Sequence, residues 1–196
     1  MKKQPEVTAQ TRKKLMDAFW DIYYEKGMQH TTVGAITKSA GYNRGTFYEY
    51  FTDIYDLLGQ LEDDLLEDLT FQINKIFQDG LPKDFCEFSN ACAHVFSLFG
   101  DKLYTLMGSQ GDPAFPLKLQ KKLRPIMLSF TGISKEDPYL DYLTAFGFSA
   151  MMGVVGHWYE SGKELEIEEL FQLIQTLVAT GIMGYTKRED LTLNAP

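Results

Sequence analysis

The chain has 196 residues, of which 44% are hydrophobic, and its formal net charge is −8. This apolar content is ample for a packed core, and no apolar run is long enough to cross a membrane. The two cysteines lack the CxxC spacing of a zinc site, so we expect free thiols, no metal and no cofactor. The charged start, without an apolar segment, predicts no secretory signal and a cytoplasmic protein.

The negative charge is unevenly distributed along the chain. Residues 1–50 carry eight Lys/Arg and five Asp/Glu, whereas residues 51–196 carry eleven Lys/Arg and twenty-two Asp/Glu. A basic excess confined to one end suits an electrostatic contact with DNA. Basic termini are also common as solvated tails, so the charge alone does not choose between the two.

Residues 11–58 predict a helix-turn-helix unit with a longer leading helix. The apolar residues of that helix recur at i, i+3, i+4, i+7 and i+8, which makes one buried stripe. They are Leu15, Ala18, Phe19, Ile22 and Tyr23. Thr31 or Thr32 can cap the second helix, and Gly41 permits a sharp turn after it.

A short third helix is expected from Arg44 to about Tyr50, capped by Asn43. Phe47 and Phe51 would anchor it in the small core. Polar and aromatic side chains are left on its outer face, where they can contact phosphates and base edges. The third helix is therefore the expected reading helix of a DNA-binding unit.

These residues resemble the DNA-binding domain of the tetracycline-repressor (TetR) family of bacterial transcription regulators. The matching elements are Glu25-Lys26-Gly27, Thr31-Thr32-Val33, Ile36, Ala40-Gly41, Gly45, Phe47-Tyr48 and Tyr50-Phe51. The resemblance covers about the first quarter of the chain. It implies an all-α protein of about nine helices that acts as a homodimer and has a C-terminal domain for a small effector.

On this basis we expect residues 1–52 to form the DNA-binding domain and residues 53–196 the effector-binding and dimerisation domain. The candidate DNA-binding residues are Thr31, Thr32, Val33, Asn43, Arg44, Gly45, Thr46, Tyr48 and Tyr50. One departure concerns Ile54, where family members often carry a lysine that meets a phosphate. Its neighbours Asp53 and Asp56 would repel a phosphate.

The rest of the chain predicts six more helices. The expected ranges are residues 52–78, capped by Thr52, then 84–99, 102–107, 115–130, 137–161 and 167–185. Pro125 should kink or split the seventh helix. His94 and His157 lie mid-helix among apolar residues and are expected to be hydrogen-bonded core histidines.

The last two helices carry the dimer signal, because small residues recur on one and the other is apolar over more than one face. The candidate interface residues are Gly153, Gly156, Phe171, Ile174, Leu177 and Val178. The alternative is ordinary packing within one subunit.

Candidate pocket residues for a small lipophilic effector are drawn from the aromatic- and Met-rich second part of the chain. They are Cys92, Phe96, Met107, Met127, Tyr142 and Phe146. Ordinary cores have the same composition, so this alternative stays open.

Taken together, the sequence predicts a dimeric regulator, most simply a repressor released from a palindromic operator by a small effector. An enzyme is disfavoured, because the three histidines are scattered and no nucleophile, phosphate-loop or zinc-hydrolase motif occurs. The remaining rival is a DNA-binding architectural or partner-regulated protein that has no small-molecule effector.

Overall fold

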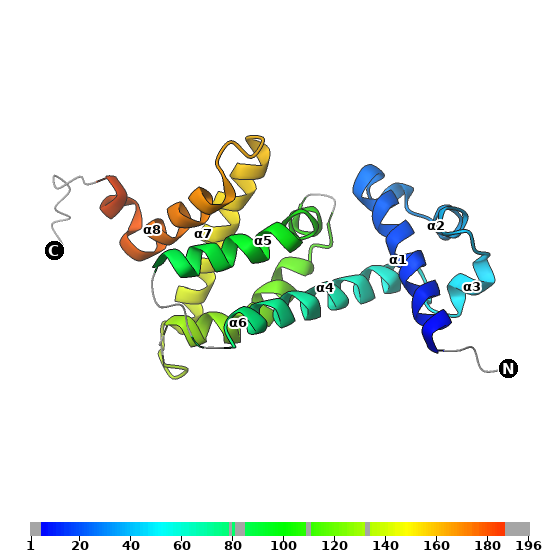
Figure 1. The fold of residues 1–196 in the computed structure, drawn as a ribbon, viewed down its shortest axis with the longest axis horizontal. Helices are drawn as coiled ribbons and strands as arrows, with labels where there is room; N and C mark the ends of the chain where they lie inside the picture. The colour runs from blue at the N-terminus through cyan, green and yellow to red at the C-terminus, as the bar shows by residue number, and fades with distance from the viewer. Residues whose placement is uncertain (1–4, 79, 81–84, 109–110, 132–133, 187–196) are drawn as a thin grey trace. The chain divides into compact units, whose positions relative to one another are not determined.

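The computed structural model describes residues 5–78, 80, 85–108, 111–131 and 134–186. Of residues 5, 6, 85, 86, 88, 127, 129–131 and 182–186 it describes the backbone only. These described residues form eight α-helices and one 3-10 helix, and no strand (Figure 1). In chain order they are α1 (Pro5–Lys26), η1 (Met28–His30), α2 (Val33–Ala40), α3 (Arg44–Tyr48), α4 (Ile54–Ile76), α5 (Phe85–Met107), α6 (Phe115–Thr131), α7 (Leu140–Glu160) and α8 (Ile167–Thr186). The all-α fold predicted from the sequence is confirmed.

The chain divides into two compact units. The first unit comprises Met1–Asp68 and Lys102–Pro116, and the second comprises Leu69–Asp101 and Leu117–Pro196. Helices α4, α5 and α6 therefore each contribute residues to both units.

The core of the first unit is made by the apolar stripe of α1 together with residues from the following helices. Its large, fully buried apolar side chains are Leu15, Phe19, Ile36, Phe47, Phe51, Leu57, Leu106 and Phe115. Helix α2 packs on both α1 and α3. Phe47 and Phe51, one helical turn apart, have ring centroids 5.4 Å apart. These two rings fix α3 to the rest of the unit, as the sequence pattern predicted.

The second unit has its own apolar cluster, formed by α5, α7 and α8. Its buried members are Ala93, Val155, Trp158, Leu170, Phe171 and Ile174. The indole Nε1 of Trp158 donates a hydrogen bond to the carbonyl of Leu165 at 2.8 Å, so the one polar atom of this large side chain is satisfied.

The helices expected at residues 84–99 and 102–107 are a single helix, α5. Gly100, where the break was predicted, stays helical and is buried. A Cβ at this position would lie 2.7 Å from Cε1 of Phe96. Glycine therefore leaves room for the Phe96 ring, which lies against the helix one turn earlier. Packing thus outweighs the low helix propensity of glycine.

Helix α4 is capped by Asp53, and the expected cap at Thr52 is wrong. The Asp53 Oδ1 atom accepts hydrogen bonds from the backbone N–H groups of Tyr55 and Asp56, each at 2.8 Å. Asp56 in turn accepts from the backbone N–H of Thr52 at 2.7 Å. Asp53 therefore satisfies two free donors in the first turn of this helix, and Asp56 satisfies the donor of the residue before the cap.

Other sequence expectations need correction. Helix α6 continues through Pro125 without being split. Helix α7 begins at Leu140, after a turn in which Asp137 Oδ1 accepts from the backbone N–H of Tyr139. Both His94 and His157 are exposed, because each lies on the outer side of its helix, and neither is a core histidine.

Candidate nucleic-acid interface

Helix α2 begins at a threonine pair whose two members have different roles. Thr32 is exposed, and its Oγ1 accepts a hydrogen bond from the backbone N–H of Ala35 at 3.2 Å, so it is the N-cap. Thr31 is buried, and its Oγ1 donates to the carbonyl of Gly27 at 3.0 Å. Of the two, Thr32 is the one whose side chain is open to a ligand.

The turn between α2 and α3 depends on Gly41. This residue has φ 75° and ψ 29°, a left-handed conformation that costs glycine little. The backbone N–H of Tyr42 donates to the carbonyl of Thr37 at 2.9 Å, which closes the end of α2. The chain can therefore enter α3 within two residues.

Helix α3 is short, capped at its start and anchored on one side. Asn43 Oδ1 accepts from the backbone N–H of Thr46 at 2.9 Å, as predicted for an N-cap. Phe47 is fully buried, while the adjacent Tyr48 is 58% exposed. Arg44 and Gly45 are also exposed, so the outer face of α3 presents a guanidinium, open backbone and a phenol.

The nine candidate DNA-binding residues do not all have access to solvent. Those with exposed positions are Thr32, Asn43, Arg44, Gly45 and Tyr48, and those half-buried are Val33, Thr46 and Tyr50. All of the exposed ones lie at the start of α2 or along α3. Their chemistry, donors and acceptors on a narrow helical surface, suits phosphate and base-edge contacts.

One residue of this surface was missed by sequence reasoning. The guanidinium of Arg44 lies over Gly34 of α2, since a Cβ at Gly34 would be 3.1 Å from Arg44 Nη2. The available signal was a glycine in the first turn of a helix, where almost any other residue is more stable. The contact itself joins two helices and has no signature in the sequence.

Part of the basic charge expected at this end is already paired. The Nη1 atom of Arg12 lies 2.7 Å from Asp64, and the same guanidinium donates to Gln60. Lys13 lies 2.6 Å from Asp17. The positive potential of the first unit is therefore weaker than the count of basic residues implies.

The start of α4 is acidic and hydrogen-bonded. The backbone N–H of Thr52 and the amide of Gln60 lower the pKa of Asp56, so that carboxylate stays charged well below neutral pH. Ile54 is half-buried, and it is not among the fully buried core residues. The position can thus reach solvent, next to two carboxylates.

The candidate pocket residues are divided between the two units. Cys92 and Phe96 are half-buried in the second unit, whereas Met107 is half-buried in the first. Tyr142 and Phe146 are 76% and 68% exposed on α7. The side chain of Met127 lies outside the described residues.

Cys92 and Phe96 nevertheless belong to one aromatic neighbourhood in the second unit. The ring of Phe96 packs edge-on against Trp158 and Phe171, with centroids 6.1 and 5.5 Å away. Burial raises the pKa of the Cys92 thiol to about 12, so it is a neutral, weakly polar side chain. This corner of the unit is apolar, and the Cys92 thiol is the one thiol among its described side chains.

The candidate dimer residues differ in how far they are buried. Phe171 and Ile174 are buried in the cluster that α8 forms with α5 and α7. Leu177 and Gly156 are half-buried, and Gly153 and Val178 are exposed. Nothing within 4 Å would meet a Cβ at either glycine, so the chain's own packing does not require small residues there.

Across the described ranges, no three His, Cys, Asp or Glu side chains are grouped closely enough to hold a metal ion. Among the helices described, none combines the length and apolarity that crossing a bilayer would need.

Residues 15–61 match the family model described as bacterial regulatory proteins, tetR family. This range contains α2, α3 and the start of α4, including all of the exposed DNA-binding candidates. No curated protein matches the chain.

Solved structures share the fold over most of its length. A TetR transcriptional regulator from Streptococcus agalactiae is 24% identical, with a TM-score of 0.64, covering 88% of this chain and 96% of that one. The fatty acid degradation regulator FadR from Bacillus halodurans is 17% identical, with a TM-score of 0.68 and coverage of 94% and 100%. FadR from Thermus thermophilus, a repressor solved with lauroyl-CoA, is 17% identical, with a TM-score of 0.51 and coverage of 87% and 94%. At these identities the likeness establishes the fold alone.

Proposed function

We propose that this chain, whose residues 15–61 match the model of the tetR family of bacterial regulatory proteins, is a homodimeric repressor that binds a palindromic operator and is released by a small lipophilic effector. The observation that carries the proposal is helix α3. It is capped by Asn43 and anchored by the buried Phe47, and it holds Arg44 and Tyr48 in the open.

In this proposal α3 enters the major groove and α2 approaches the phosphates. Arginine recognises guanine through two parallel hydrogen bonds, and such a pair discriminates against other bases by about 1–3 kcal/mol. The cap hydroxyl of Thr32 and the phenol of Tyr48 are suited to phosphate oxygens, which position a protein without reading sequence. A single module of this size binds weakly, so two heads are needed.

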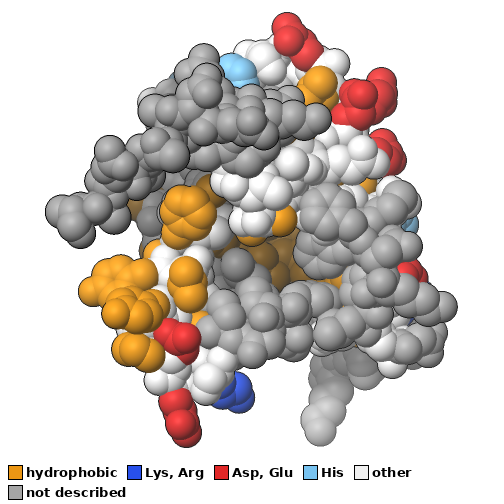
Figure 2. All heavy atoms as spheres, turned by 90° about the vertical axis from the view of Figure 1, so that its left-hand side faces the viewer, with side chains coloured by type: hydrophobic (Ala, Val, Ile, Leu, Met, Phe, Trp, Pro, Cys, Tyr) orange, Lys and Arg blue, Asp and Glu red, His pale blue; other side chains and the backbone are white. Residues whose placement is uncertain are grey.

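The second copy is proposed to cover an exposed apolar stripe on α7. Its members, the N-cap residue Tyr139 and three residues of the helix, recur at i, i+3, i+4 and i+7, so they lie on one side of the helix. They are Tyr139, Tyr142, Leu143 and Phe146. Figure 2 draws a face of the molecule on which hydrophobic side chains gather in the open. Contiguous exposed apolar patches mark interaction surfaces.

The proposed interface therefore includes this stripe with Gly153 and the 55% exposed Val178. Phe171 and Ile174 contribute to it only by supporting α8 from within. Phe146→Glu should shift the chain toward a monomer in sedimentation, because a charge would be buried between the copies. Leu98→Glu, an equally drastic change at an exposed position of α5, should leave the oligomeric state unchanged.

The effector is proposed to bind in the second unit, near the apolar corner of Cys92 and Phe96. The Thermus neighbour supports a lipophilic molecule with an acyl chain as the first compound class to test, since its structure holds lauroyl-CoA. In a sensor of this kind, effector and operator weaken each other's binding by the same factor, typically about 5–150.

The DNA proposal is tested by selecting duplexes from a random-sequence library with the purified chain. We expect an enriched palindrome whose half-sites are centred about one helical turn, ~34 Å, or a multiple apart. Binding that stays indifferent to sequence at every salt concentration would contradict a reading role for α3.

The effector proposal is tested with lauroyl-CoA and free fatty acids. A ligand of the native chain must raise its melting temperature, and an effector must also weaken binding to the selected duplex. A compound that raises the melting temperature without changing operator affinity binds but does not signal. No rise with any compound would favour the alternative, a partner-regulated or architectural DNA-binding protein.

A further inference from the structure

Gly34 and Arg44 lie against each other on the exposed side of the helix-turn-helix unit. Gly34 is the second residue of α2, and Arg44 is the first residue of α3. A Cβ at Gly34 would be 3.1 Å from Nη2 of Arg44 and 3.9 Å from Cζ and Nε. All three atoms belong to the planar guanidinium group, so this group lies across the position that a side chain at residue 34 would fill.

The backbone does not require glycine at this position. Gly34 lies in a regular helix, and it is not among the residues with positive φ. Glycine destabilises a helix relative to alanine, and here no sharp turn compensates for the loss. What glycine provides at residue 34 is space, and the group that occupies this space is the Arg44 guanidinium.

The electrostatic surroundings do not hold Arg44 in place. Within the described part of the chain its guanidinium makes no ion pair, and the first turn of α2 has no acidic side chain. The start of a helix is its positive end, so a cation gains nothing from lying there. No described charge therefore fixes the guanidinium over Gly34, and its hydrogen-bond donors stay available to an incoming acceptor.

We propose that Gly34 is a positioning residue for DNA reading: its missing side chain lets the Arg44 guanidinium lie over α2 in the direction from which it contacts a base edge. The inference rests on the proposed function, because it names how one reading residue of α3 is aimed. A guanidinium that already lies in this direction needs less rearrangement of its side chain when it binds. A side chain at residue 34 would occupy the space in which the Arg44 guanidinium lies.

The test uses the duplex that the wild-type chain selects, and the variants Gly34→Ala, Gly34→Leu and Arg44→Ala. Arg44→Ala should weaken operator binding about 5–150-fold, the range expected for a lost bidentate base contact. Gly34→Leu should approach that loss and Gly34→Ala should show part of it. The operator position at which Arg44→Ala relaxes base preference should be relaxed by Gly34→Leu as well.

The decisive measurement is the double variant. If Gly34 acts through Arg44, adding Gly34→Leu to Arg44→Ala should change operator affinity by less than about twofold. Equal losses in the two backgrounds, or no loss in either, would overturn the proposal. Failure of the wild-type chain to select any sequence would instead overturn the proposed function.

Folding defects are separated by a matched control. Gly59→Ala, in α4 of the same unit, makes the same chemical change where nothing lies within 4 Å of the new Cβ. Both alanine variants should melt about 2–4 °C higher, because alanine stabilises a helix. Only Gly34→Ala should then bind the operator more weakly. Weaker binding by Gly59→Ala as well would assign the effect to stiffening of the unit.

Discussion

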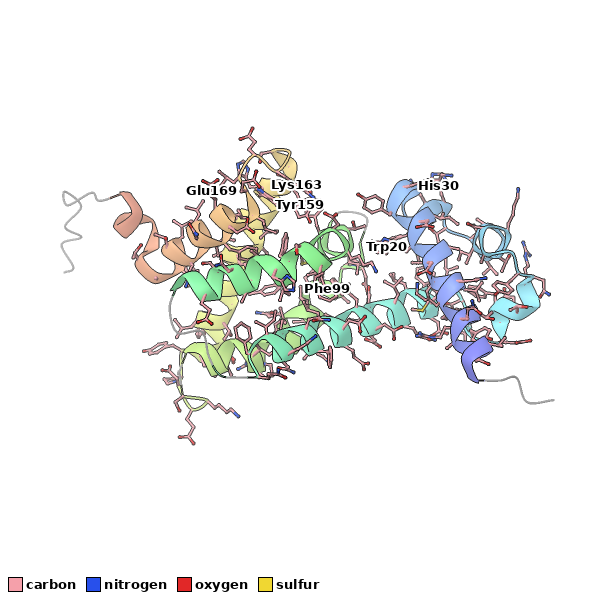
Figure 3. All side chains as sticks on the ribbon, viewed as in Figure 1. Trp20, His30, Phe99, Tyr159, Lys163 and Glu169 are labelled. Carbon is pink, nitrogen blue, oxygen red and sulfur yellow. The ribbon has the colours of Figure 1, made fainter. Side chains whose placement is uncertain are left out.

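The ammonium group of Lys163 lies 2.8 Å from Oδ1 of Asp101 and 4.5 Å from the ring centroid of Tyr159, whose hydroxyl donates to the same carboxylate oxygen. Lys163 and Tyr159 are labelled in Figure 3. Lys163 has φ 62°, an uncommon conformation for a residue other than glycine. The carboxylate of α5 therefore holds the end of α7 and the turn that follows it. This contact lies within the second unit.

The contact of Asp101 with Lys163 and Tyr159 makes a pH-dependent contribution to the stability of the fold. The hydrogen bonds from Lys163 and then from Tyr159 lower the pKa of Asp101 below its ordinary value of 3.8. A carboxyl whose pKa is lower in the folded state stabilises the fold above its unfolded pKa. That stability is lost as the pH falls through the folded value.

Asp101→Asn should therefore have a lower urea midpoint than the wild-type chain at pH 7, and the difference should close as the pH falls below 3.8. The effect should be small, because the Asp101 side chain is largely exposed. Glu164→Gln, an exposed acid in the same turn, serves as the control. A difference that persists unchanged at low pH would mean that Asp101 acts through packing and not through its charge.

Phe47 and Tyr48 are adjacent aromatic residues with opposite expected effects. Phe47 is fully buried, so Phe47→Ala should lower the free energy of unfolding by about 3–5 kcal/mol. Operator binding should be lost because the helix-turn-helix unit unfolds. Tyr48 is exposed, so Tyr48→Ala should stay within about 1 kcal/mol of wild type. It should still weaken binding to the operator. Urea titration and a mobility-shift assay distinguish the two.

The opposite pattern would place the reading face elsewhere. If Tyr48→Ala unfolds the unit, then the edge contact between the two rings, whose centroids are 5.5 Å apart, is structural. If it binds the operator with wild-type affinity, the phenol does not touch DNA.

The first unit was largely predictable from sequence because its signals are local. The Asn43 cap, the left-handed Gly41 and the spacing of Phe47 and Phe51 each act within one helical turn. Local signals failed where two acceptors competed. Both Thr52 and Asp53 can cap a helix, and the charged Asp53 does so while Asp56 satisfies the donor of Thr52.

The second unit was less predictable, because composition does not say which face of a helix is covered. Tyr142 and Phe146 were candidate pocket residues because the second part of the chain is rich in aromatic residues. In the structure both side chains are exposed on α7. The helix break expected between residues 99 and 102 does not occur, because Gly100 leaves room for the ring of Phe96. The contact of Gly34 with Arg44 was also beyond prediction, since it depends on how two helices cross.

Cys92 is expected to be chemically inert in the native chain. Its thiol has a pKa of about 12, against an ordinary value of 9.0, so at pH 8 it holds about a thousandfold less thiolate. In a Cys86→Ser chain, whose remaining cysteine is Cys92, alkylation by iodoacetamide should be about that much slower than in urea. Mass spectrometry of the time course measures it. Similar rates in both conditions would show that the thiol is accessible and open to a redox role.

The last prediction concerns Ile54, at the first turn of α4. If this position faces a phosphate, as the family resemblance implies, Ile54→Lys should strengthen binding to all duplexes. It should also steepen the slope of log affinity against log salt by about 0.9, the value for one neutralised phosphate. Ile54 is half-buried, so the lysine stem can lie along the helix while its ammonium reaches solvent.

The control is Tyr55→Lys, which adds the same charge one residue later on a side chain that is 68% exposed and points in another direction. Its salt slope should stay unchanged if the effect belongs to a single phosphate contact. A similar gain of DNA affinity in both variants would instead reflect the added positive charge of the unit and not one phosphate contact. A lower melting temperature of Ile54→Lys with an unchanged slope would make Ile54 a core residue, since burying an ammonium group costs stability.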